Sequence, residues 1–281
     1  MKKIYLVMHQ RKPDTVSIIR QLCTEMKTAG LQPIAEPWLS SVVGEELSWL
    51  EYCASAENCE AVLAIGGDGT FLRANSFALA YGLPLLGINL GTVGFLSEVE
   101  WEQIGAACRA LAEGRYTIES RMLLEARVGD KRFLALNDIV LSRGGYARLI
   151  GMNVHMEKEK LDPYIGDGLI ISTPTGSTGY SLSAGGPVVH PSLECIIMTP
   201  ICCHSLQHRP VVTASTQTIT IELDHRYNCT AQVDVDGQQA VYLNAGEKLY
   251  ITKAEQSTQL IHIDPNDFFS TIRIKLAEWS H

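Results

Sequence analysis

The chain has 281 residues, of which 46% are hydrophobic, and its formal net charge is −8 at pH 7. This length allows one or two domains with substantial cores. The acidic balance argues against nucleic acid or a membrane as the main partner, since both select basic surfaces, but it permits a small anionic ligand. No apolar run approaches the roughly 20 residues that span a bilayer. The eight cysteines are scattered without a CxxC pair, so we expect structural thiols in a cytoplasmic protein.

Up to about residue 114 the chain alternates short apolar segments with segments of helical periodicity. We expect strands at residues 4–8, 61–65 and 84–89. Helices are expected at residues 15–29, 70–81 and 100–113, with Thr70 as the N-cap of the second. Such alternation is typical of a parallel sheet with helices on its faces.

After residue 115 the periodicity becomes that of β-strands. Segments 122–128 and 131–136 flank Gly129-Asp130, and segments 231–235 and 239–243 flank Asp236-Gly237; both dipeptides are hairpin signals. Residues 217–223 and 247–253 alternate between apolar and polar side chains. We therefore expect an α/β N-terminal domain with a parallel sheet (residues 1–114 plus 266–281) and an all-β C-terminal domain (residues 115–265). The C-terminal tail is expected to pack back on the first domain.

Residues 66–70, Gly-Gly-Asp-Gly-Thr, join an expected strand to an expected helix. Ligands of open α/β sheets usually bind at this end of a strand, where glycines and a helix N-terminus favour phosphate. The loop is neither GxGxxG nor a Walker A loop. Asp68 is then either a turn or cap residue, or an acid that aims a hydroxyl at a phosphoryl group. A carboxylate with a pKa of roughly 3.9 is a weak base, but phosphoryl transfer mainly requires aiming, and Mg²⁺ would reduce the repulsion from phosphate.

Polar residues in the second half also have two interpretations. Asn137 and Asp138 interrupt a strand-like stretch, where both residue types are disfavoured. Residues 173–180 have the composition of a polar loop, and Asp167 and residues 236–238 suit turns. Each of these structural interpretations stands beside a role in ligand binding that only a family resemblance implies.

Basic residues are equally ambiguous. Arg73 suits either a solvated helix face or a phosphate site, and Arg148 suits a strand edge. Lone histidines near prolines are more often structural or exposed than catalytic, and three fit that description: His190, His204 and His208.

Six segments resemble a known family. The GGDGT loop at residues 66–70 is similar to the loop that NAD kinases, lipid kinases and phosphofructokinases share, and by itself it cannot choose among them. The others resemble NAD kinases in sequence and order: NLGTVGFL at 89–96, ALND at 135–138, DGLIISTPTGSTGYSLSAGGP at 167–187, RP at 209–210 and VDG at 235–237. From about residue 4 to about residue 270 the chain therefore resembles the bacterial-type, ATP/polyphosphate-dependent NAD kinases.

The resemblance implies a phosphotransferase that moves the terminal phosphoryl group of ATP, or of polyphosphate, to the 2′-hydroxyl of the adenosine ribose of NAD, making NADP. Asp68 would be the catalytic residue, and Mg²⁺ or another divalent cation would accompany the phosphates, with no residue assigned as a metal ligand. Asp138 stands where many relatives have Glu, and Gly179 stands where many have Ala at the expected adenine wall. The residues implied to bind NAD or nucleotide are Gly66, Gly67, Asp68, Gly69, Thr70, Arg73, Asn137, Asp138, Arg148, Asp167, Thr178, Gly179, Tyr180, Ser181, Ser183 and Gln238.

The resemblance also implies a homo-oligomer, either a dimer or a tetramer. Two alternatives remain open. A lipid kinase of the same superfamily would need an apolar entry patch and a basic face, which the charge of −8 and the Ser/Thr-rich segment disfavour. A catalytically silent NAD or NADP sensor is disfavoured by the intact Asp68.

Overall fold

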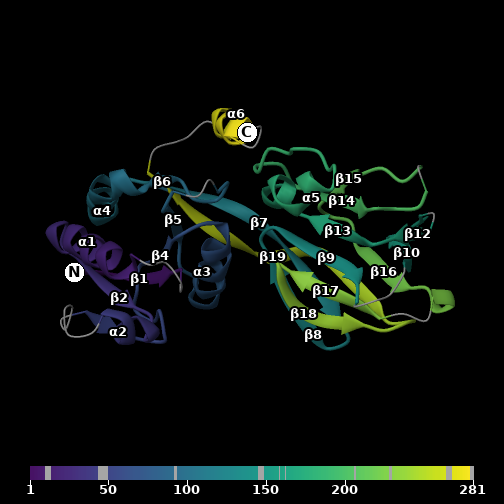
Figure 1. The fold of residues 1–281 in the computed structure, drawn as a ribbon, viewed down its shortest axis with the longest axis horizontal. Coiled ribbons are helices and arrows are strands. Elements are labelled where there is room, and N and C mark those ends of the chain that lie inside the picture. The colour runs from purple at the N-terminus through teal and green to yellow at the C-terminus, as the bar shows by residue number, and fades with distance from the viewer. Residues whose placement is uncertain are drawn as a thin grey trace. The chain divides into compact units, whose positions relative to one another are not determined.

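The computed structural model describes residues 1–9, 14–43, 50–91, 94–144, 149–157, 159–161, 163–205, 207–227, 230–263 and 268–278 (Figure 1). The chain forms two compact units: a first unit, Met1–Ser120 with Thr258–His281, and a second unit, Arg121–Ser257. Strands β7 (Thr117–Val128) and β19 (Lys248–His262) both continue from one unit into the other. The boundaries between the two units therefore lie within β7 and within β19. The change of periodicity in the sequence coincides only with the beginning of β7.

A parallel sheet forms the centre of the first unit. Its strands lie in the order β3-β2-β1-β4-β5, and all neighbours in this order are parallel. On β5, Ile88 also pairs with Val99 of β6, and Leu260 of β19 pairs with Leu85, so the end of β19 returns to this unit. The strand bounds are β1 Lys2–Met8, β2 Leu31–Ala35, β3 Glu51–Tyr52, β4 Ala61–Ile65, β5 Leu85–Asn89 and β6 Val99–Glu100.

Helices cover both faces of this sheet, because successive side chains of a strand point to opposite faces. Ile4, Leu6 and Met8 of β1 belong to one core with the apolar sides of α1, α2 and α4. Tyr5, between them in sequence, contacts Phe77 of α3 instead, with 5.3 Å between the ring centroids. The helix bounds are α1 Thr15–Thr28, α2 Trp38–Val43, α3 Asp68–Tyr81, η2 Trp101–Gln103, α4 Ile104–Glu113 and α6 Phe268–Glu278.

The predicted strands and helices of the first unit are confirmed, but α3 begins earlier than expected. It starts at Asp68, its N-cap is Gly67, and that cap makes no side-chain hydrogen bond, so the prediction that Thr70 is the N-cap was wrong. Thr70 is instead buried in the first turn, where its backbone N–H donates to the Gly67 carbonyl at 2.9 Å. Strand β2 and helix α2 were not predicted, since Pro33 and Pro37 obscure the periodicity there.

Antiparallel strands make up most of the second unit. One sheet has the order β15-β14-β13-β9-β17-β18, and the other joins β11, β10, β16 and β19, with β12 beside β10. Strands β7 and β8 form the hairpin predicted around Gly129-Asp130, and β17 and β18 form the one predicted around Asp236-Gly237. The remaining bounds are β8 Lys131–Ala135, β9 Asp138–Arg143, β10 Ile150–Met156, β11 Glu159–Lys160, β12 Tyr164–Gly166, β13 Gly168–Ser172, β14 Cys195–Ile201, β15 Val211–Ala214, β16 Ile219–Leu223, β17 Ala231–Val235 and β18 Gln238–Leu243.

The core of the second unit is built from alternate residues of these strands. Ile139 and Leu141 of β9 share a buried cluster with Ile219 and Ile221 of β16, so side chains from both sheets meet in it. The unit is β-rich, as predicted, but it is not purely β. Short helices η3 (Thr175–Thr178), α5 (Tyr180–Ser183) and η4 (His225–Tyr227) interrupt it. Among the described residues, no helix is both long and apolar enough to cross a membrane.

Candidate functional site

The glycine loop of the first unit has a backbone that only glycine adopts easily. Gly66 has a φ of +155°, and an ideal Cβ at this position would lie 2.5 Å from Oγ1 of Thr70. Its N–H donates to the Ile88 carbonyl at 3.0 Å, which joins the loop to the neighbouring strand β5. The loop therefore turns tightly from β4 into α3 and places Asp68 at the positive end of that helix.

The carboxylate of Asp68 is held by a segment distant in sequence. Oδ2 accepts the N–H of Phe95 at 3.1 Å, and Oδ1 accepts the N–H of Leu96 at 3.2 Å. An ideal Cβ on Gly94 would overlap Oδ1 and lie 2.9 Å from Cγ of Asp68, so this backbone fits the carboxylate only as glycine. The GGDGT loop and the NLGTVGFL segment thus form one structure, in which Asp68 is fixed by tertiary contacts and not by a local turn.

Arg73, on the first turns of α3, is engaged by protein groups. Its Nη2 donates to Oε2 of Glu36 at 3.0 Å and to the Met8 carbonyl at 2.5 Å, and its Nη1 also pairs with Glu36. The Glu36 side chain is only 7% exposed, and its carboxylate also accepts the Met8 N–H at 3.3 Å. This ion pair gives Arg73 a structural role, and its predicted contact with phosphate stays a prediction.

In the second unit, Asn137 and Asp138 lie at the start of β9, beside the segment that contains Gly179. An ideal Cβ on Gly179 would lie 3.8 Å from Nδ2 of Asn137 and 3.8 Å from Oδ2 of Asp138. The Oδ1 atom of Asn137 is buried, and the described residues provide no hydrogen-bond partner for it. Two motifs separated by about forty residues therefore present polar side chains at one place, and one buried acceptor there has no donor within the described part of the chain.

The charge of Asp138 is disfavoured by its surroundings. The residue is 6% exposed. Burial, followed by the nearby carboxylates of Asp236 and Asp234, raises the pKa of Asp138 to about 7 from an ordinary 3.8. The group therefore titrates near neutral pH, unlike an ordinary aspartate.

The Ser/Thr-rich segment forms η3 and α5, not an open loop. Thr178 is buried, and its Oγ1 donates to the Thr175 carbonyl at 3.2 Å. Ser181 is fully buried, with its Oγ 2.8 Å from Oγ1 of Thr199. Tyr180 is 48% exposed, and Ser183 is exposed at the end of α5. Tyr180 and Ser183 thus have side chains accessible to a ligand, whereas the hydroxyl of Ser181 is used within the fold.

The other predicted site residues are more scattered. Asp167 lies between β12 and β13, and its Oδ1 is 3.6 Å from Nε of Arg143. Gln238 is the exposed first residue of β18. Arg148 lies outside the described residues.

Known proteins are similar to this chain along almost its whole length. Residues 4–116 match the family model described as the ATP-NAD kinase N-terminal domain, and residues 136–263 match the one described as the ATP-NAD kinase C-terminal domain. An NAD kinase of Ruminiclostridium cellulolyticum is 36% identical over 285 residues, covering 99% of both chains. An NAD kinase of Moorella thermoacetica is 44% identical over 223 residues, covering 78% of this chain and 71% of that one.

The chain belongs to the NAD kinase family.

Solved structures of NAD kinases have the same fold. The crystal structure of yeast NADH kinase complexed with NADH matches with a TM-score of 0.88 and 26% identity, covering 99% of this chain and 88% of that one. An NAD kinase from Archaeoglobus fulgidus, crystallised with ATP, has a TM-score of 0.74 at 24% identity, covering 96% and 98%, and supports the fold alone. The predicted membership of this family and the predicted fold class are therefore confirmed.

In this member of the NAD kinase family, the groups that hold the site residues were not predicted from the sequence. The N–H groups of Phe95 and Leu96 fix Asp68, and Asp236 and Thr173 contact the backbone beside Asn137. The family signatures include all of these positions, but their role depends on backbone contacts that sequence does not specify.

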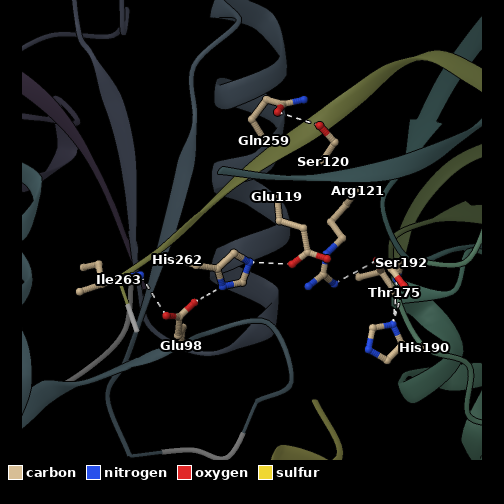
Figure 2. Close-up of polar contacts among 10 residues, drawn as sticks. All are labelled: Glu98, Glu119, Ser120, Arg121, Thr175, His190, Ser192, Gln259, His262 and Ile263. Carbon is tan, nitrogen blue, oxygen red and sulfur yellow. Dashed lines mark hydrogen bonds and ion pairs between the residues drawn. The ribbon is translucent and has the colours of Figure 1, made fainter. Parts of the chain in front are cut away.

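The structure also reveals an ion-pair cluster in the first unit, formed by His262, Glu98 and Glu119 (Figure 2). His262 Nδ1 pairs with Glu98, and its Nε2 lies 2.8 Å from Oε2 of Glu119. Glu98 also accepts the Ile263 N–H at 3.1 Å. Hydrogen bonds to Glu119 and Glu98 raise the pKa of His262 to about 9. No sequence signal pointed to this cluster, whose three members come from distant segments.

The three histidines expected to be structural or exposed occupy ordinary positions. Nδ1 of His190 lies 2.7 Å from Oγ of Ser192 (Figure 2). His208 stacks on Tyr164, with the ring centroids 4.2 Å apart. His204 is exposed on the loop after β14.

Proposed function

We propose that this chain is an NAD kinase that transfers the terminal phosphoryl group of ATP to the 2′-hydroxyl of the adenosine ribose of NAD, making NADP. The observation that carries the proposal is the carboxylate of Asp68, held at the start of α3 by two N–H groups of the segment 89–96. An acid fixed by two family motifs is suited to aim a hydroxyl. A relative named NAD kinase, 36% identical to this chain over 99% of both chains, supports this reaction.

In this proposal Asp68 orients the 2′-hydroxyl and accepts its proton as the bond to phosphorus forms. Each carboxylate oxygen has two acceptor positions, so the bonds from Phe95 and Leu96 leave capacity for the hydroxyl. Because the transition state of phosphoryl transfer is loose, a weak base with fixed direction is adequate. The same two N–H donors stop the side chain from rotating away.

The phosphate groups would be bound by the start of α3. The N–H groups of Gly66 and Thr70 are already used, by the Ile88 and Gly67 carbonyls. We therefore assign phosphate to the amides of Gly67, Asp68 and Gly69, the first groups of a helix that lack intrahelical partners. A Cβ added at Gly69 would meet nothing within 4 Å, which leaves open space beside this backbone.

NAD would be bound by the residues that surround Gly179. Asn137 and Asp138 would accept the ribose hydroxyls, and the exposed ring of Tyr180 would stack on the nucleotide. Thr178, Ser181, Ser183, Asp167, Gln238, Arg73 and Arg148 are kept as proposed contacts from the family resemblance. Four of these would first have to exchange protein partners: Thr178, Ser181, Asp167 and Arg73.

A divalent cation, Mg²⁺ in the first instance, would accompany the donor phosphates. Among the described residues, no group of three His, Cys, Asp or Glu side chains could hold a metal ion. This fits Mg²⁺, which is commonly held by substrate phosphates and water with one or two carboxylates. Asp68, the acid of the glycine loop, would be the carboxylate near the ion. When bound, the ion would neutralise charge on the phosphates. We propose polyphosphate as a second donor.

We further propose a cytoplasmic homo-oligomer, a dimer or tetramer, without nucleic acid or membrane as partner. The seven described cysteines are all free thiols, which favours a reducing compartment. The edge strands β15 and β18 of the six-stranded sheet expose Val212 (51%) and Tyr242 (48%), which suits a partner subunit. The net charge of −8 supports the exclusion of anionic polymers and surfaces.

The test is product formation from NAD and NADH, each with ATP and with polyphosphate, in the presence of Mg²⁺. We expect NADP or NADPH from the wild type and a loss of at least about 100-fold in kcat for Asp68→Asn, with NAD binding retained. Asp130→Asn, an exposed aspartate in the β7–β8 turn, is the matched control. NAD binding without turnover in the wild type would support the sensor instead, and phosphorylation of diacylglycerol vesicles would support the lipid kinase.

A further inference from the structure

Asp236 lies in the turn between β17 and β18, but its side chain does more than a turn requires. Its φ is +48° and that of Gly237 is +74°, the left-handed pair of a type I′ hairpin. Asn and Gly would satisfy this backbone equally well. The Asp236 carboxylate, however, reaches three consecutive backbone N–H groups of another segment. Oδ2 accepts from Leu136 at 2.9 Å, and Oδ1 accepts from Asn137 at 2.7 Å and from Asp138 at 3.2 Å.

The contact runs in both directions. The backbone N–H of Asp236 donates to the Asp138 carbonyl at 3.0 Å. Four hydrogen bonds therefore join one turn residue to the three residues that precede and begin β9. Because only a carboxylate offers acceptors on both oxygens and no competing N–H, neither Asn nor Gly could make the same set.

Thr173 holds two of these three residues, Leu136 and Asn137, through their carbonyl groups. Its Oγ1 donates to the Leu136 carbonyl at 2.6 Å, and its N–H donates to the Asn137 carbonyl at 2.9 Å. An ideal Cβ on Gly176 would lie 2.5 Å from the Asn137 carbonyl carbon, so the backbones are in close contact there as well. With its N–H and C=O groups fixed on both sides, this segment has one orientation, which directs the Asn137 and Asp138 side chains toward Gly179.

We propose that Asp236 is a positioning residue for NAD: its carboxylate clamps the backbone of residues 136–138 and so sets the direction of the Asn137 and Asp138 side chains, which receive the ribose, and the charge of Asp138. The proposal rests on the proposed function for the meaning of those two side chains. The effect on charge follows from the same geometry. Asp236 and Asp234, both from the β17–β18 hairpin, are the carboxylates whose charge, after burial, raises the pKa of Asp138. Removal of the Asp236 charge therefore lowers the pKa of Asp138.

The test compares Asp236→Asn and Asp236→Gly with the wild type, using full-length protein. Both variants suit a left-handed turn, so we expect the hairpin to form, as checked by circular dichroism and thermal melting. Asp130→Asn, in the other hairpin turn, is the control. We expect the KM for NAD to rise about tenfold or more, the loss of more than one well-made charged hydrogen bond, with the KM for ATP within about twofold. The pH at which the KM for NAD changes should move to a lower value, because Asp138 would ionise at a lower pH.

A merely structural role predicts a different pattern. It would lower stability and kcat and raise the KM for NAD and the KM for ATP together. It would leave the pH dependence of the KM for NAD unchanged. That pattern, an unchanged KM for NAD, or failure of both variants to fold would overturn the proposal. If the wild type and Asp130→Asn make no NADP, the proposed function fails instead, and calorimetric binding of NAD by the same variants then decides the positioning role on its own.

Discussion

Replacement of Asp138 by Asn should stabilise the protein at neutral pH while it weakens NAD binding. The side chain is 6% exposed and has a pKa of about 7, against an ordinary 3.8. At about 1.4 kcal/mol per pH unit, this difference corresponds to an upper limit of about 4 kcal/mol by which ionised Asp138 destabilises the folded state at pH 8. Asn is neutral at every pH, so Asp138→Asn removes this term.

The sign and the pH window follow from the raised pKa. Below pH 3.8 the group is protonated in both states and has no effect; as the pH rises to about 7, the unfolded state ionises first and stability is lost. The free energy of unfolding of Asp138→Asn minus that of the wild type should therefore increase by about 3 kcal/mol between pH 5 and pH 8. Urea denaturation at both pH values measures this difference.

The control for this experiment is Asp130→Asn, which replaces an exposed aspartate in a turn. Its difference from the wild type should be the same at both pH values. In activity assays Asp138→Asn should raise the KM for NAD by about 10-fold to 100-fold, as expected for the loss of a charged hydrogen-bond acceptor. If the stability difference of Asp138→Asn does not change with pH, the argument that burial and neighbouring carboxylates disfavour its charge is refuted.

Three further outcomes are expected. Gly94→Ala should lower kcat by at least about 100-fold with little change in circular dichroism, because its Cβ would displace the Asp68 carboxylate. The wild type should be more stable than His262→Gln by about 1–2 kcal/mol at pH 6, a value reduced because the His262 side chain is 23% exposed. This difference in the free energy of unfolding, measured by urea denaturation, should disappear as the pH rises from about 6.5 through about 9. Gly179→Ala should fold normally, because its Cβ would meet its nearest neighbour, the Gly176 carbonyl oxygen, at 3.4 Å. It should lower the KM for NAD by up to about threefold, because it adds a methyl group at the expected adenine wall.

Each of these predictions has an outcome that contradicts it. Wild-type kcat in Gly94→Ala would mean that Asp68 need not be fixed in this position. A His262→Gln variant whose deficit grows above pH 9 would have the wrong sign for a histidine ionised by its two glutamates. A raised KM for NAD in Gly179→Ala would indicate that the space beside Asp138 is needed by the ligand.

The periodicity of the sequence was sufficient for the elements that have clear local signals. In β1 and β4 apolar runs give buried strands, and α1, α3 and α4 end at residues where a glycine follows or nearly follows. The Asp-Gly turn between β17 and β18 was evident for the same reason, since its backbone favours these residue types. The start of α3 was placed two residues late because the cap is a glycine without a side-chain hydrogen bond, which leaves no sequence signal.

The sequence by itself determined that an α/β domain precedes a β-rich one and that Asp68 lies in a glycine loop directly after a strand. It also determined the family to which the chain belongs. These features are encoded by local spacing and residue type. Only the tertiary structure decided that Phe95 and Leu96 hold Asp68, that Arg73 pairs with Glu36, and that Asp236 clamps the backbone before β9. The reason is that each of these contacts joins residues 27 to 100 positions apart through backbone groups or buried charges. Neither hydrophobic periodicity nor turn propensity carries information about such pairs.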